Sequence, residues 1–178
     1  MKINKTKLIV VVGIFSAIAF LLQVIGSMMG IKVSGFLEIE LSDLPALIIA
    51  LAYGPLAGVL VELIKNVLHC FMTSTGFVGE FSNFVVNGTM CLVAGLIYRH
   101  FRTFKGALVA LLVGTLVMSV VGIFSNLFVM LPLYMSEAPF YVKLNLTLGT
   151  ILPFNLIKGV AISVITILVY KKISKLIK

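Results

Sequence analysis

Tryptophan is absent from this chain, cysteine occurs twice, and charged residues make up only 11% of it. Hydrophobic residues reach 61%, which is more apolar surface than a soluble domain can hide. These proportions are typical of an integral membrane protein, and we expect residues 1–178 to form a single transmembrane domain. Cys70 and Cys91 lie in apolar stretches without CxxC or metal-ligand spacing, so we expect buried thiols and no disulfide.

Catalytic and nucleotide-hydrolysing motifs are also missing. The sequence has no GxxxxGK[ST], HExxH or GxSxG motif and no Cys/His cluster, and its six acidic residues are scattered. We therefore expect no enzyme activity, no hydrolysis of ATP by the chain itself and no cofactor. The net charge of +8 comes from basic residues beside apolar spans, which favours membrane orientation over nucleic-acid binding.

Six apolar spans are predicted. The first follows a basic start, but it is too long for a signal peptide and has no cleavage site, so we expect a retained helix. The second is short for a membrane about 30 Å thick, which leaves open a single kinked helix over 44–72. The spans are at about 8–28, 44–53, 55–72, 81–98, 106–131 and 149–170.

Charge placement favours six helices. With six, most basic residues fall on the side of the two termini and most acidic residues on the other, as the positive-inside rule requires. The predicted fold is an all-α integral membrane protein, a six-transmembrane-helix bundle with both termini cytoplasmic. Its longest outer loops would be 30–42 and 132–148. In the first of these loops, apolar and acidic residues alternate over 36–41, which is typical of a short strand or hairpin. We therefore expect an outer lid loop between the first two helices. Ser42-Asp43 before Pro45 indicates a helix N-cap.

Lys158 is the most informative polar residue, because it is a lone charge in the apolar stretch from Gly149 to Tyr170. An intramembrane lysine is costly and usually faces a protein interior or a cavity. Asparagines on three helices are predicted at similar depth, about 3–14 Å below the outer surface. We favour an outward-facing pocket, although membrane asparagines also join helices and Lys158 could pair with Glu62 or Glu38. The asparagines are Asn83, Asn87, Asn126 and Asn155.

Two further features have open interpretations. Glu62, Lys65 and His69 share a helix face, either as a self-neutralising pair beside a histidine, which we favour, or as a proton relay. Gly13 and Ala17 have small-xxx-small spacing, which allows close helix approach within the bundle or to a partner.

Five segments together resemble the riboflavin-specific S component of energy-coupling factor (ECF) vitamin transporters, and the similarity covers nearly the whole chain. The most specific segment is Leu152-Pro153-Phe154-Asn155-Leu156-Ile157-Lys158-Gly159. The others are Glu38 to Leu47, Ala52 to Gly58, Glu62 to Asn66, and Gly79 to Phe84.

The resemblance implies a high-affinity riboflavin-binding subunit in a bacterial plasma membrane. It would capture riboflavin from outside and deliver it with a transmembrane T component and two ATPase subunits. The family meets the T component through small residues of its first helix, often as AxxxA. In this sequence, Gly13 and Ala17 are the nearest match.

Flavin chemistry fits these residues. The ring has a uracil-like edge of donors and acceptors, which the amides of Asn126 and Asn155 can read, with Lys158 as a further donor. Asn83, Asn87 and the first outer loop with Glu38 are placed for the ribityl hydroxyls. Without tryptophan, any stacking on the ring must use phenylalanine or tyrosine. Residues expected to enclose it are Phe36, Leu41, Phe84 and Phe154.

Alternatives to riboflavin capture remain open. The chain could be an S component for another vitamin or nucleobase-like compound. It could instead be an autonomous proton-coupled transporter using Glu62, Lys65 and His69, or a membrane scaffold without a ligand. The apolar inner half of the predicted helices argues against the proton-coupled alternative.

Overall fold

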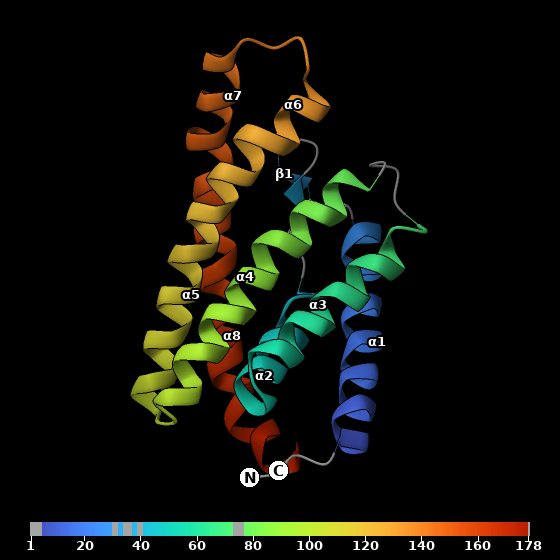
Figure 1. Cartoon of the computed structure of the whole chain (residues 1–178), viewed down its shortest axis with the longest axis vertical. Coiled ribbons are helices and arrows are strands. Elements are labelled where there is room, and N and C mark those ends of the chain that lie inside the picture. The colour runs from blue at the N-terminus through green and yellow to red at the C-terminus, as the bar shows by residue number, and fades with distance from the viewer. Residues whose placement is uncertain (1–4, 30–31, 34–36, 39–40, 73–76, 178) are drawn as a thin grey trace.

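The computed structural model describes residues 5–29, 32–33, 37–38, 41–72 and 77–177 and shows a bundle of helices (Figure 1). Four helical runs are long and apolar enough to cross a membrane: Lys5–Met29, Val78–His100, Phe104–Tyr134 and Phe140–Tyr170. The chain is therefore a multi-pass helical membrane protein. The elements in order are α1 (Lys5–Met29), β1 (Lys32–Val33), β2 (Leu37–Glu38), α2 (Leu44–Tyr53), α3 (Pro55–His69), α4 (Val78–His100), α5 (Phe104–Ser125), η1 (Asn126–Met130), α6 (Leu131–Tyr134), α7 (Phe140–Leu146), η2 (Thr147–Ile151) and α8 (Leu152–Ile177).

A tight turn at Gly54 separates α2 from α3. Gly54 has φ 110°, a conformation that suits glycine, and Pro55 then starts the next helix. The two helices fold back on each other, since a Cβ on Gly58 would lie 2.5 Å from the Cβ of Ala50. The prediction of two helices is confirmed, and the alternative of one kinked helix over 44–72 is wrong.

Helix α2 is the centre of the bundle. It packs against α1, α3, α4 and α8, and every residue from Pro45 to Leu51 is buried. Continuous burial explains why this segment is apolar on all sides rather than on one face. The turn before α2 is buried as well, since Ser42 and Asp43 are 0% and 3% exposed.

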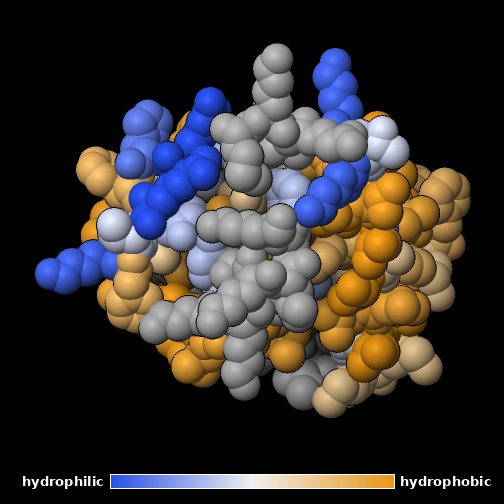
Figure 2. Space-filling view, turned by 90° about the horizontal axis from the view of Figure 1, so that it is seen from below, coloured by the Kyte–Doolittle hydropathy of each residue, from blue (hydrophilic) through white to orange (hydrophobic). Residues whose placement is uncertain are grey.

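Both ends of the described chain lie at one end of the bundle (Figure 1). The same end holds the α4–α5 connection, and Figure 2 views it directly, with hydrophilic residues on the upper and left parts of the view and apolar residues on the right and lower parts. The exposed basic residues of this region are Lys5, Lys7, Arg99, His100, Arg102 and Lys105. This clustering of positive charge at one end agrees with the charge asymmetry of the sequence.

Two π-helical turns widen the last two helical runs, and both precede a Leu-Pro pair. The turns η1 and η2 end directly before Leu131-Pro132 and Leu152-Pro153. A proline ring clashes with the carbonyl four residues earlier and provides no N–H, and a wider turn relieves both problems. The long outer loop predicted over 132–148 is therefore wrong, because helix occupies all of it except residues 135–139.

Between α1 and α2, β1 and β2 form a short antiparallel pair in which Lys32 faces Glu38 and Val33 faces Leu37. The hairpin predicted for this segment is confirmed for these four residues.

Substitution of Gly58 by alanine should destabilise the α2–α3 hairpin. The added Cβ would also lie 2.8 Å from the carbonyl oxygen of Ala46, and overpacking of this kind costs about 1–3 kcal/mol. Gly13→Ala is the matched control, because a Cβ there has nothing within 4 Å. Thermal unfolding of the detergent-purified variants should show a lower melting temperature for Gly58→Ala alone. Equal melting temperatures would contradict this packing.

Candidate functional site

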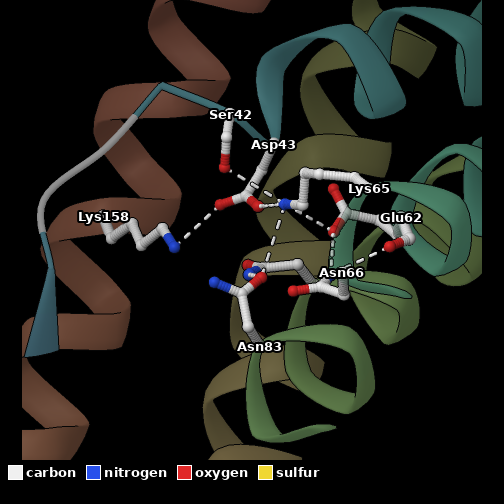
Figure 3. A network of polar contacts seen from close by, with 8 residues as sticks. Ser42, Asp43, Glu62, Lys65, Asn66, Asn83 and Lys158 are labelled. Atoms are coloured by element: carbon white, nitrogen blue, oxygen red, sulfur yellow. Dashed lines mark hydrogen bonds and ion pairs between the residues drawn. The ribbon is translucent and has the colours of Figure 1, made fainter. Parts of the chain in front are cut away.

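A buried carboxylate joins two lysines from different helices (Figure 3). Asp43 lies in the turn before α2, and its Oδ2 is 2.8 Å from the Nζ of Lys158 on α8. Its Oδ1 accepts a hydrogen bond from the Nζ of Lys65 on α3. Lys65 is 0% exposed and Lys158 is 9% exposed, so both charges depend on protein partners.

Lys65 has further partners. Its Nζ is 2.8 Å from Oε2 of Glu62 and donates to Oγ of Ser42 at 3.1 Å and to Oδ1 of Asn83 at 3.4 Å. The predicted self-neutralising pair of Glu62 and Lys65 is thereby confirmed. Among the described residues, the ammonium groups of Lys65 and Lys158 lie against the carboxyl groups of Asp43 and Glu62, as expected for buried charges.

The two lysines favour the ionised form of Asp43. Burial alone would raise its pKa, but the positive charges of Lys158 and Lys65 outweigh burial and lower the pKa to about 2. Asp43 stands at the N-cap position of α2 as predicted, yet its side chain makes no capping hydrogen bond. It turns to the lysines instead. The sequence feature that could have indicated this role is the position of a carboxylate directly before a helix that is apolar on all sides.

The partner of Lys158 in the described part of the structure is Asp43, which was not among the sequence-based candidates. Glu62 pairs with Lys65 rather than with Lys158. The side chain of Glu38 lies outside the described part of the structure, as does the whole of Phe36.

Asn126 and Asn155 converge on Gly122 of α5. The Nδ2 of Asn126 donates to the carbonyl of Gly122 at 2.8 Å. A Cβ at Gly122 would collide with the Nδ2 of Asn155, so glycine makes room for this amide. Asn155 is 6% exposed, and its Nδ2 has no hydrogen-bond partner among the described residues. A buried donor without a partner costs about 1–3 kcal/mol, which a ligand acceptor would recover.

The asparagines and the charge cluster lie next to each other. Asn155 and Lys158 are one turn apart on α8. On α4, Asn87 donates to Oδ1 of Asn83 at 2.9 Å, and Asn83 accepts from Lys65. Val86 lies 3.7 Å from the position of a Cβ at Gly122, which places this part of α4 beside Asn155. The predicted polar residues thus come together where α4, α5 and α8 meet.

The depths predicted for Asn155 and Lys158 assumed that their helix starts at residue 149. The helical run begins at Phe140 instead, so these depths do not apply.

The apolar residues predicted to enclose the ligand differ in burial. Phe84 and Phe154 are half-buried, whereas Leu41 is 46% exposed.

His69 belongs to a different contact. Its Nδ1 is 3.0 Å from Oε1 of Glu80 on α4, and its Nε2 is 3.5 Å from Oγ of Ser27 on α1. These partners tie α1, α3 and α4 together at the end of α3. The arrangement favours a structural role for His69 over a relay with Lys65.

Gly13 and Ala17 are exposed on the outer face of α1. They do not serve packing within the bundle at this face, since a Cβ on Gly13 has nothing within 4 Å. The strip is open to lipid or to a partner.

Lys65→Met should strongly destabilise the protein. The change removes one ammonium and leaves Asp43 and Glu62 buried with less compensation, a loss of about 3–5 kcal/mol in other buried pairs. Lys105→Met is the control, because Lys105 is exposed. Thermal unfolding in detergent should separate the two variants. A Lys65→Met protein as stable as the Lys105→Met protein would refute the pairing.

Comparison with known proteins points to a transport family. Residues 7–170 match the family described as "ECF transporter, substrate-specific component". The chain is 33% identical to the riboflavin transporter RibU of Staphylococcus aureus (strain TCH60), over 100% of this chain and 96% of that protein. It is 35% identical to the riboflavin transporter FmnP of Bacillus subtilis (strain 168), over 95% of this chain and 93% of that protein.

A solved structure has the same fold. That structure, described as "Structure and mechanism of the S component of a bacterial ECF transporter", matches this chain with a TM-score of 0.83 and 32% sequence identity. The match covers 98% of this chain and 99% of the other. The family consists of transport components and not of enzymes, in agreement with the sequence. This chain belongs to the substrate-specific components of ECF transporters.

Proposed function

We propose that this chain is the high-affinity riboflavin-binding subunit of an ATP-driven ECF vitamin importer. Riboflavin is its transported ligand, and residues 1–178 act as one transmembrane domain. Support comes from the relatives in Staphylococcus aureus and Bacillus subtilis, both named as riboflavin transporters and both similar over almost their whole length.

The buried amide of Asn155 is the observation that carries the proposal. Its Nδ2 lacks a partner among the described residues, and Asn126 is anchored to the same backbone at Gly122. The polar edge of a flavin ring provides carbonyl oxygens and ring nitrogens that accept hydrogen bonds from such donors. Lys158, one turn away, adds a charged donor whose orientation Asp43 maintains. Asn83 and Asn87 are the proposed partners of the ribityl hydroxyls.

Leu41, Phe84 and Phe154 are the proposed apolar contacts to the ring, together with Phe36 and Glu38 from the first outer loop. This loop follows α1 and leads through β1 and β2 to Asp43. We propose that it acts as a lid over the bound flavin.

Delivery would require a T component and two ATPase subunits, since the chain has no nucleotide-binding motif of its own. The exposed strip of Gly13 and Ala17 is the proposed contact to the T component, because small residues allow close helix approach.

Six helical runs would cross a bacterial plasma membrane, with both termini in the cytoplasm. The basic end of the bundle supports this orientation. A fluorescent protein fused to the C-terminus should fold and fluoresce in cells. Alkaline phosphatase inserted between Met135 and Pro139, at the opposite end, should be active outside. A dark C-terminal fusion with an inactive insertion would indicate the reverse orientation.

Riboflavin binding is directly testable. Protein purified from cells grown with riboflavin should be yellow with a flavin spectrum, and the ligand-free protein should quench riboflavin fluorescence. Lys158→Met should weaken binding roughly ten- to hundredfold, because it removes a charged hydrogen-bond donor. Lys143→Met is a matched control, since Lys143 is equally buried at 9% but contacts the carbonyl of Ser136.

Two results would contradict the proposal. Colourless protein without riboflavin affinity would exclude the ligand, and a screen of other vitamins would then identify the correct one. Equal effects of Lys158→Met and Lys143→Met would remove Lys158 from the site.

A further inference from the structure

If the proposed function holds, the charge cluster of Asp43, Glu62, Lys65 and Lys158 influences which ligands the site binds. Lys158 is the charged residue closest along α8 to the ligand donor Asn155. Its ammonium lies 2.8 Å from a carboxylate oxygen of Asp43, in a region where both side chains are at least nine-tenths buried. The lysine that would contact a ligand is therefore already paired with a fixed negative charge.

The second lysine is paired in the same way. Lys65 is 2.8 Å from Glu62 and also contacts Asp43, so each of the two ammonium groups has a carboxylate partner. Asp43 is shared, because one oxygen faces Lys65 and the other faces Lys158. The shared carboxylate reduces the positive charge that the two lysines present to a ligand.

We propose that Asp43 is a specificity-determining residue, which lowers the affinity for phosphorylated flavins by holding a negative charge against Lys158. An uncharged flavin loses little from the presence of Asp43, since it needs only hydrogen-bond donors and acceptors. An anionic flavin must leave water and then meets the negative charge of Asp43 beside the lysine that would otherwise attract it. The selected substrate class is thus the uncharged flavin over its 5′-phosphate.

The size of the effect follows from Coulomb's law. Two unit charges about 10 Å apart, at an effective dielectric constant of about 20, change an equilibrium constant by roughly tenfold. The ratio of the two dissociation constants isolates this effect, because a general loss of site geometry weakens both ligands. Riboflavin and riboflavin 5′-phosphate are both fluorescent, so quenching titrations give both constants on the same protein.

Asp43→Asn is the primary variant, since it removes the charge at nearly constant shape. The affinity for the phosphate relative to that for riboflavin should rise roughly tenfold or more. Asp43→Glu keeps the charge and should retain the ratio of the unmodified protein. The double variant Asp43→Asn with Lys65→Met removes one positive charge again, and its ratio should fall back from that of Asp43→Asn by a similar factor.

Asn83→Asp provides a second route if Asp43→Asn does not fold, because the Asn83 side chain already accepts a hydrogen bond from Lys65 and a carboxylate there would keep that partner. It adds a negative charge and should shift the ratio in the opposite direction, toward riboflavin. Equal ratios in the unmodified protein and in every folded variant would overturn the inference while leaving riboflavin binding intact. Failure of the unmodified protein to bind riboflavin would instead overturn the proposed function, so the two failures are distinguishable.

Discussion

The carboxylate of Asp43 is the group on which the rest of the site depends. Two lysines are buried between the helices, and each would be prohibitively costly without a negative partner. One side chain partners both, and this places the turn before α2 against α3 on one side and α8 on the other. The connection between the first and second helices is therefore linked directly to the predicted ligand-binding lysine.

Close backbone approach complements this pairing. Gly58 lets α2 and α3 touch, and Gly122 leaves space for the amide of Asn155. Near the same region, the π turns before Leu131-Pro132 and Leu152-Pro153 absorb two prolines without ending their helices. Gly122, the amide of Asn155 and the widened turns thus lie around the junction of α4, α5 and α8, whereas Gly58 lies where α3 meets α2. Such local departures from regular helix are common at functional sites of membrane proteins.

Much of this architecture is predictable from the sequence, because membrane helices must be long and apolar. The six predicted spans each correspond to a helical run, and even the break at Gly54 was indicated by Gly-Pro. The asparagines and Lys158 stood out because polar groups are costly in lipid. One prediction was wrong, the long loop over 132–148, and the disfavoured alternative of a single kinked helix over 44–72 does not occur. The loop prediction failed because Phe140 to Leu148 contains polar residues that resemble a loop yet remain helical.

The sequence by itself determined the class of protein, the approximate spans and the identity of the buried polar residues, since these follow from hydrophobicity and the cost of burying charge. Only the tertiary structure decided the pairing. Glu62 and Asp43 were both carboxylates within reach of a lysine in principle, and distance alone assigned the first to Lys65 and gave the second to both lysines. Spacing along one helix describes neighbours on that helix. Asp43 instead reaches Lys158 from a turn in the first part of the chain, and only the packing of α2 against α8 brings the two into contact.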